Sequence, residues 1–296
     1  MNTSISTRPL PAPLVPALAV AVTVISWASA FPFIRIGLHG LPPLQLAAAR
    51  FATAAVLVAI WLAWRRPRLP SVRDAVRFLL CGAIGIAAYN ALLNTGEKTV
   101  SAGAASFIVN TLPIFTAIFA TVFLRERFNR WGWCGSAISL AGVAVIALGQ
   151  PGGLVLGAGA SLILCAAMCS AAYFVLQKRL IPVYGALACT AYTLLAGALW
   201  LSPWLPGAVT SLTVASPDTV AAVLILGIFP AAIGYATWTF ALGHFGAARA
   251  ANFLYLTPAV ATTLSIALTG ERPGVATLCG GLMAISGVVF VAWLGR

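Results

Sequence analysis

The segment Leu112–Arg127, LPIFTAIFATVFLRER, is matched by Thr257–Arg272, TPAVATTLSIALTGER, about 145 residues later in the chain. The same offset, without a gap, aligns Cys134-Gly135 with Cys279-Gly280 and Gly142-Val143 with Gly287-Val288. The chain is 61% hydrophobic and 7% charged, whereas soluble repeats are shorter and more polar. The repeated unit is therefore predicted to be a set of membrane-spanning helices.

Apolar windows of about 20 residues, the length that crosses a bilayer core, predict ten transmembrane helices joined by short loops. The predicted spans are residues 14–34, 44–64, 76–95, 100–124, 130–149, 156–177, 184–204, 217–240, 247–269 and 274–294. A ten-strand barrel is excluded, because its strands would be about 10 residues long with alternating polarity. The predicted fold class is an all-α integral membrane protein.

The predicted domain organisation follows from the number of spans between equivalent residues. Five spans separate them, and an odd number places the two copies upside down relative to each other. We expect a cytoplasmic tail at residues 1–13, a first five-helix repeat at 14–150 and a second, inverted five-helix repeat at 151–296. The tail lacks the basic, apolar and cleavable regions of a signal peptide, so the first span is expected to remain as an anchor.

The formal net charge of +12 could indicate nucleic-acid binding, but its distribution along the chain indicates membrane topology. In the ten-span arrangement most cationic residues share one side: Arg8, Arg65, Arg66, Arg68, Arg73, Arg77, Arg125, Arg127, Arg130, Lys178, Arg179 and Arg296. Only Arg35, Lys98 and Arg272 fall on the other side. The positive-inside rule then places both termini in the cytoplasm, and no nucleic-acid partner is expected.

Polar and aromatic side chains inside the predicted spans recur at helical spacing and so form stripes. The candidate substrate-binding residues are Trp27, Asn90, Asn94, Ser106, Asn110, Tyr173, Tyr235, Trp238, Asn252 and Tyr255. The 145-residue offset pairs Asn90 with Tyr235 and Asn110 with Tyr255. A cavity between the repeats would therefore have asparagine on one side and aromatic rings on the other. The alternative for any single asparagine is a contact between helices, worth about 0.6–2 kcal/mol.

Two prolines, Pro113 and Pro258, occupy equivalent positions near the middle of the fourth and ninth spans. Each removes a helical hydrogen bond and frees a carbonyl one turn earlier, at Val109 and Leu254. In lipid such a carbonyl must face protein or water. We expect a kink beside a cavity that contributes to gating, with a static packing kink as the alternative.

Further segments complete a family resemblance. They are LQLAAARF at residues 44–51, Trp27-Ala28-Ser29-Ala30-Phe31, and the two proline-to-Glu-Arg runs, each followed by a glycine-bearing span. In order and duplication they resemble the ten-helix drug/metabolite transporters of the EamA type, with Ala28 in place of the usual glycine. The resemblance implies solute transport by alternating access, most often export from a bacterial inner membrane. It also implies that Arg50 matches the family's arginine and fixes helix packing through carbonyls.

Charged residues restrict the mechanism further. Only Arg50 and Arg249 lie at membrane depth, where charges are functional by default, although Arg249 can snorkel to the interface. Glu126 and Glu271 lie where one span ends and the next begins, and each is expected to cap the N–H groups of the next helix. No acid falls in the middle of a span, which disfavours the proton exchange of small multidrug antiporters.

The predicted substrate is consequently a neutral or zwitterionic solute with an apolar body, since amides can bind a polar head and aromatic rings an apolar side chain. We predict an inner-membrane exporter of hydrophobic or aromatic amino acids and related metabolites. A broad exporter of neutral drugs is the first alternative. A scaffold or an intramembrane enzyme is the second, and the spans contain no histidine–acid pair or metal-binding cysteine pattern to support an enzyme. No cofactor or metal is expected, and oligomeric state stays open.

Overall fold

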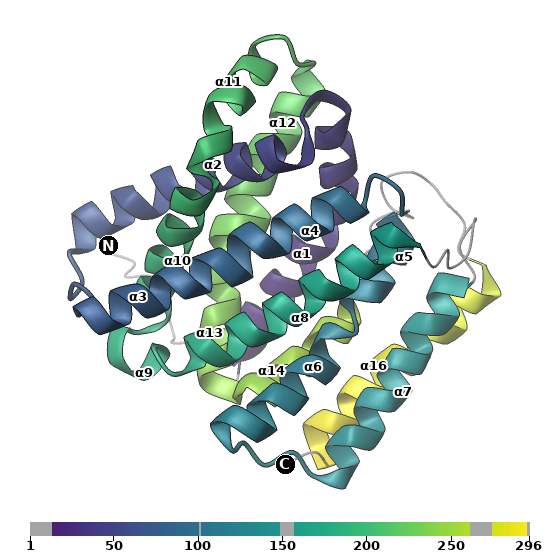
Figure 1. Ribbon diagram of the computed structural model, residues 1–296. Helices are drawn as coiled ribbons and strands as arrows, with labels where there is room; N and C mark the ends of the chain where they lie inside the picture. Colours follow the sequence, from purple (N-terminus) through teal and green to yellow (C-terminus); the bar gives the residue numbers. More distant parts are fainter. Residues whose placement is uncertain (1–13, 101, 149–156, 261–273, 295–296) are drawn as a thin grey trace, which may run out of the picture.

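The computed structural model describes residues 14–100, 102–148, 157–260 and 274–294, and all regular structure within them is helical. The predicted tail, residues 1–13, and the Glu271-Arg272 pair lie outside the described residues. In Figure 1 helices from the two ends of the sequence interleave: α1 packs on α12 and α13, and α10 packs on α2. The predicted repeats therefore share one helical assembly.

Seven helices among the described residues are long and apolar enough to cross a membrane. They are Leu14–Gly40, Pro43–Arg65, Val72–Gly96, Ala105–Leu124, Ala158–Lys178, Ala186–Thr213 and Pro217–Phe245, with a shorter apolar stretch at Leu278–Val291. Large apolar side chains such as Ile60, Val122 and Leu282 are more than half exposed, as hydrocarbon-facing side chains must be. An all-helical membrane fold is thereby confirmed.

Several of these spans consist of more than one helical element. In the N-terminal part the elements are α1 (Leu14–Gly40), α2 (Pro43–Arg65), α3 (Val72–Cys81), η1 (Gly82–Ala88), α4 (Tyr89–Gly96), α5 (Ala102–Val109), α6 (Leu112–Phe119), η2 (Ala120–Leu124) and α7 (Arg130–Leu148). In the C-terminal part they are α8 (Ala158–Lys178), α9 (Ile181–Tyr184), α10 (Ala186–Leu201), η3 (Ser202–Trp204), α11 (Leu205–Thr213), α12 (Pro217–Leu226), η4 (Gly227–Gly234), α13 (Tyr235–Phe245), α14 (Ala247–Asn252), η5 (Phe253–Leu256) and α16 (Val275–Leu294).

The interruptions fall at corresponding positions of the two halves of the chain. The π-helical segments η1 and η4 begin at Gly82 and Gly227, which are 145 residues apart. The chain is broken between α5 and α6, just before Pro113, and it passes through the 3-10 turn η5 just before Pro258. Because π-bulges and mid-helix 3-10 turns often mark functional sites, a functional site is expected where these four interruptions meet.

The seventh span extends beyond its predicted end at residue 204. The chain continues from α10 through η3 into α11 and ends at Thr213. Pro203 and Pro206 do not end the helical path, because each lies in the first turn of a helix. Proline is tolerated there because its missing N–H would have no helical partner.

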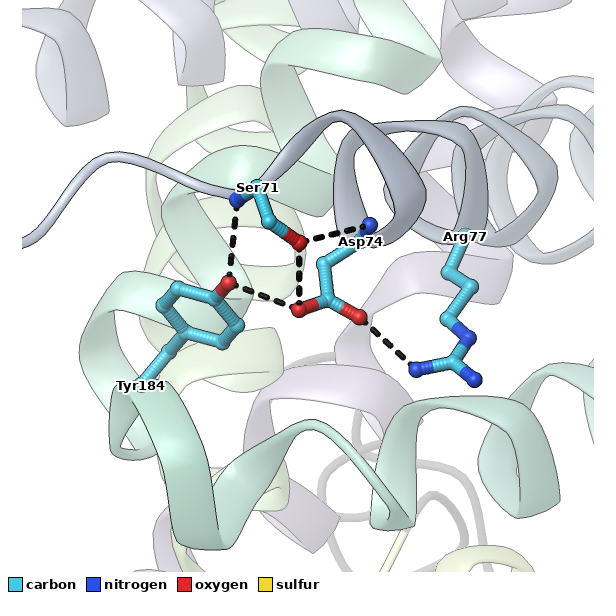
Figure 2. Close-up of polar contacts among 4 residues, drawn as sticks. All are labelled: Ser71, Asp74, Arg77 and Tyr184. Atoms are coloured by element: carbon cyan, nitrogen blue, oxygen red, sulfur yellow. Dashed lines mark hydrogen bonds and ion pairs between the residues drawn. The ribbon is translucent and has the colours of Figure 1, made fainter.

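A polar cluster at the start of α3 ties the two parts of the chain together (Figure 2). Ser71 caps α3 by accepting a hydrogen bond from Asp74 N, and Tyr184 of α9 donates from its hydroxyl to Asp74 Oδ2 at 2.8 Å. Arg77 completes the cluster with an ion pair to Asp74 Oδ1 at 2.7 Å. The loop before α3 is thus fixed to the turn after α8.

Helices α7 and α16 form a close antiparallel pair at one side of the assembly in Figure 1. Gly135 faces Gly287, whereas Gly142 faces Gly280, so the contacts run in opposite directions along the two helices. Between them Ser139 Oγ donates to Ala284 O at 3.0 Å. Glycine at these positions lets the two backbones approach closely, as in other membrane helix pairs.

Gly142→Ala should destabilise the protein, because the added Cβ would lie 2.5 Å from Ala284 N and 2.6 Å from Gly280 O. We expect a loss of about 1–3 kcal/mol, typical of overpacking, measured as a lower thermal unfolding midpoint of the purified protein. Gly281→Ala is the matched control, because its nearest described atom is Ala259 Cβ at 4.0 Å. Equal midpoints for the two variants would show that α7 and α16 are not held this closely.

Candidate functional site

A cavity of about 60 Å³ lies where the interrupted spans meet. It is lined by Trp27, Ala30, Phe31, Ile34, Arg50, Tyr89, Leu93, Val109, Asn110, Leu112, Ser170, Tyr235, Leu254 and Thr257. These residues come from both repeats and include positions on each side of the breaks before Pro113 and Pro258. The cavity is therefore built between the two halves of the chain.

Aromatic rings form one wall of the cavity. The Trp27 ring lies 5.5 Å from Tyr235 and 5.4 Å from Trp238, and Trp238 lies 4.4 Å from Phe174. Trp27 Nε1 donates to Pro230 O at 3.1 Å, and the Tyr235 hydroxyl donates to Gly85 O at 3.4 Å. Both accepting carbonyls belong to the π-helical segments η4 and η1, so the cavity's own side chains satisfy the interrupted backbone.

Arg50 is the charged residue of the cavity lining and is only 4% exposed. Its guanidinium donates to Asn90 Oδ1 at 3.2 Å and lies 5.1 Å from the centre of the Phe51 ring. Asn90 in turn donates from Nδ2 to Ile86 O at 2.8 Å. Asn90 thus links the arginine of α2 to the backbone of η1, whereas the family resemblance had implied packing through main-chain carbonyls.

Asn110 lies at the break between α5 and α6. Its Nδ2 donates to Ser106 O at 2.6 Å, and the same carbonyl also accepts from Asn110 N at 3.1 Å. Its Oδ1 is buried and accepts no hydrogen bond from the residues that the structure describes. Because Asn110 also lines the cavity, this unpaired acceptor lies at the cavity wall.

The structure places seven of the ten predicted substrate-binding residues in or near the cavity. Trp27, Asn110 and Tyr235 line the cavity. Directly behind the lining lie Asn90, which contacts Arg50, and the rings of Tyr173 and Trp238, which pack on Phe174. Ser106 lies one turn before Asn110 and accepts its amide through the main-chain carbonyl.

The remaining three predicted residues contact other helices. Asn94 donates to Pro43 O at 3.0 Å and so joins α4 to α2. Asn252 accepts from Ser136 Oγ at 2.6 Å, and Tyr255 is fully buried in a cluster with residues of α7 and α16. These contacts match the interhelical alternative that was left open for membrane asparagines.

Sequence reasoning missed Glu97, an acid at the end of the third span. It follows the span that ends at Gly96, yet its side chain is 1% exposed and neither carboxylate oxygen has a hydrogen-bond partner among the described residues. Burial raises the pKa of Glu97 to about 8, partly offset by the positive charges of Arg35 and Arg50. The burial of Glu97 is decided by tertiary packing alone. From the sequence, an acid at the end of a span is expected to lie at the membrane–water interface.

Glu126 caps a helix, as predicted, but not the helix that follows it in the chain. Its carboxylate accepts from Ala247 N and Ala248 N, both at 3.0 Å, at the N-terminus of α14. Gly246, with φ of 82°, makes the turn that aims these N–H groups at Glu126. Lys178 donates to Leu242 O, in the last turn of α13, at 3.0 Å. The expectation that Glu126 caps α7 was therefore wrong, because its carboxylate binds the N-terminus of α14, from the other half of the chain.

Comparison with known proteins identifies the fold and the family. The EamA-like transporter family matches this chain twice, over residues 14–148 and 157–293. The chain belongs to the EamA-like transporter family. It is accordingly a membrane transporter, as its relatives are, and not an enzyme.

Its relatives cover nearly the whole length of the chain. A Streptantibioticus cattleyicolor protein named as a probable terminal-alkyne amino-acid exporter is 37% identical over 92% of each chain. The uncharacterised Bacillus subtilis transporter YdfC is 38% identical over 89% of this chain and 86% of its own. A crystal structure with a TM-score of 0.76 covers 95% of this chain and 97% of its own at 19% identity, which shows the fold.

The buried Glu97 predicts a pH dependence of stability. In the unfolded chain its carboxyl ionises near its ordinary value of 4.5, but in the folded transporter only near 8. Between these values the unfolded state binds fewer protons, so the free energy of unfolding should fall as pH rises from about 5 to 8. Thermal unfolding at pH 5, 6, 7 and 8 measures this slope.

Glu97→Gln is the control for that measurement, because it keeps the shape of the side chain without the ionisation. Its unfolding midpoint should depend less on pH than that of the unmodified protein, with the largest difference near pH 8. Parallel pH profiles for the two proteins would contradict the buried, neutral state of Glu97.

Proposed function

We propose that this EamA-like transporter exports hydrophobic or aromatic amino acids and related metabolites by alternating access. The observation that carries the proposal is the cavity between the two halves, with an aromatic wall and a few polar groups. Solute sites are mostly apolar, with a small number of placed polar groups that fix orientation. The name of the Streptantibioticus cattleyicolor relative, an amino-acid exporter, supports the same substrate class.

An arrangement of ten spans in two inverted five-helix repeats is part of this proposal. Two matches to the same family model, one for each half of the chain, support it. The contacts of α7 and α16 support it as well, because exchanging each residue for its equivalent 145 positions away turns the Gly135–Gly287 contact into the Gly280–Gly142 contact. Reciprocal contacts of this kind are what a two-fold axis produces.

Alternating access requires that one end of the cavity closes while the other opens. Glu126 on the N-terminus of α14 and Lys178 on the carbonyls of α13 hold one end of the assembly together. These contacts are charge-assisted and match the partial charges of the helix ends. The breaks before Pro113 and Pro258 are the points at which we propose that the spans bend.

The proposed orientation places both termini in the cytoplasm of a bacterial cell, with the protein in its inner membrane. The Escherichia coli relative YedA, 30% identical over 86% of this chain, is named an inner membrane transporter. Reporter fusions after Arg68, after Arg130 and at Arg296 should be active in the cytoplasm. Fusions near Pro151 and after Thr213, where the seventh span ends, should be active outside it. A cytoplasmic signal at Pro151 would contradict the proposed five-span repeat and its inversion.

Transport is tested with purified protein in liposomes and a panel of labelled amino acids, nucleosides and dyes. We expect counterflow of phenylalanine and leucine at equal internal and external pH.

Trp27→Ala should reduce the affinity for aromatic amino-acid substrates about 2-fold to 10-fold more than the affinity for free alanine as a substrate, because the substitution removes a stacking surface. Trp64→Ala is the control, because Trp64 is 75% exposed on the outer surface. Transport of dyes or nucleosides without amino acids would refute the proposed substrate class.

A further inference from the structure

Arg50 combines features that its helix-packing role does not explain. It is the charged member of the cavity lining, almost fully buried, and no carboxylate of the described residues lies within 4.0 Å of its guanidinium. Arginine keeps its proton in proteins, and a charge without a counter-ion is strongly disfavoured at low dielectric. A buried cation at membrane depth is therefore expected to have a function.

The contacts that Arg50 makes leave most of its hydrogen-bond donors without a partner among the described residues. One guanidinium nitrogen donates to Asn90 Oδ1, a neutral acceptor, and the Phe51 ring lies on one side. Its Nε is buried and has no partner among the described residues. A guanidinium presents five N–H donors in a planar fork, so these contacts orient Arg50 without neutralising it.

We propose that Arg50 binds the carboxylate of the transported amino acid, while Asn110 Oδ1 accepts a hydrogen bond from its α-ammonium group. This assignment rests on the proposed function and specifies how the same cavity recognises its substrate. Planar guanidinium and carboxylate groups pair through two parallel N–H···O bonds. The apolar side chain of the amino acid then lies along the Trp27 and Tyr235 rings.

The charge balance of the cavity favours this class of ligand over others. An organic cation would be repelled by Arg50, and a neutral drug would leave its charge unpaired. A phosphate dianion would need a second cation, and the lining contains no other among the described residues. A zwitterionic amino acid satisfies both the cationic Arg50 and the accepting Asn110.

Glu97 does not compete for Arg50 at neutral pH. It interacts electrostatically with Arg35 of α1 and Arg50 of α2, and it lies near Tyr89 of α4. Since burial raises the pKa of Glu97 to about 8, its carboxyl is mostly protonated at pH 7. The positive charge of Arg50 therefore remains available to a substrate carboxylate.

The first test uses the unmodified transporter in lipid nanodiscs and three ligands that share one aromatic body. Phenylalanine carries both charged groups, 3-phenylpropanoate only the carboxylate, and 2-phenylethylamine only the ammonium. Binding measured by calorimetry at pH 7 should be about 10-fold to 100-fold weaker for the amine than for phenylalanine, because it lacks the charge-assisted bond. 3-Phenylpropanoate should retain more of the affinity than the amine. An amine that binds as tightly as phenylalanine would overturn the assignment.

The second test compares variants. Arg50→Gln should weaken the binding of phenylalanine at least about 10-fold but leave the binding of 2-phenylethylamine unweakened. The affinity of Arg50→Lys for phenylalanine should lie between those of Arg50→Gln and the unmodified protein. Arg35→Gln is the matched control, because this arginine is exposed and lies outside the cavity lining. A misfolded variant would lose both ligands, so the thermal unfolding midpoint of each variant is measured first. In a folded Arg50→Gln variant, equal losses for the two ligands, or no loss for phenylalanine, overturn the assignment.

The two proposals fail in different ways. If none of the amino acids binds or is transported, the proposed function is wrong and the role of Arg50 falls with it. If phenylalanine is transported but removal of its carboxylate does not weaken binding, the function stands and only the assignment of Arg50 fails.

Discussion

A polypeptide inside a bilayer has to satisfy its backbone hydrogen bonds within the protein, and the site depends on how this chain does so. Interrupted helices at membrane depth leave carbonyls that need donors. Trp27 donates to Pro230 O in η4, and Tyr235 donates to Gly85 O in η1. Both side chains line the cavity. The side chains that bond to the interrupted backbone are thus also part of the cavity wall.

The few charged residues that matter act at helix ends or in the cavity, and each interacts with another part of the chain. Glu126 binds the N-terminus of α14, and Lys178 binds the last carbonyls of α13. Both contacts match the partial charges of helix ends. Arg50 lies in the cavity without a carboxylate partner among the described residues, and Glu97 is buried nearby, where burial raises its pKa. A low-dielectric interior makes each of these positions energetically significant.

Membership of the family shows that the protein is a transporter, but the side chains of the cavity determine what it can carry. Uncharacterised relatives such as YdfC are similar in sequence over most of the chain. The substrate class has to be read from Trp27, Tyr235, Arg50 and Asn110. Sequence reasoning proposed three of these four as site residues, because aromatic and amide side chains stand out in apolar spans, and the structure places all three in the cavity lining. It assigned Arg50 to packing, because the role of a cation depends on whether an acid lies beside it.

The sequence by itself determined the membrane class, the family and the offset that relates the two halves, because apolar spans and repeated motifs are one-dimensional patterns. It also located the interrupted spans through Pro113 and Pro258. Tertiary structure alone decided that Asn252 and Tyr255 face α7 and α16 and not the cavity, since every face of a membrane helix can be apolar. It decided as well that Glu126 caps α14 and that Glu97 is buried. Capping and burial depend on which helix lies opposite, and spacing along the chain carries no such information.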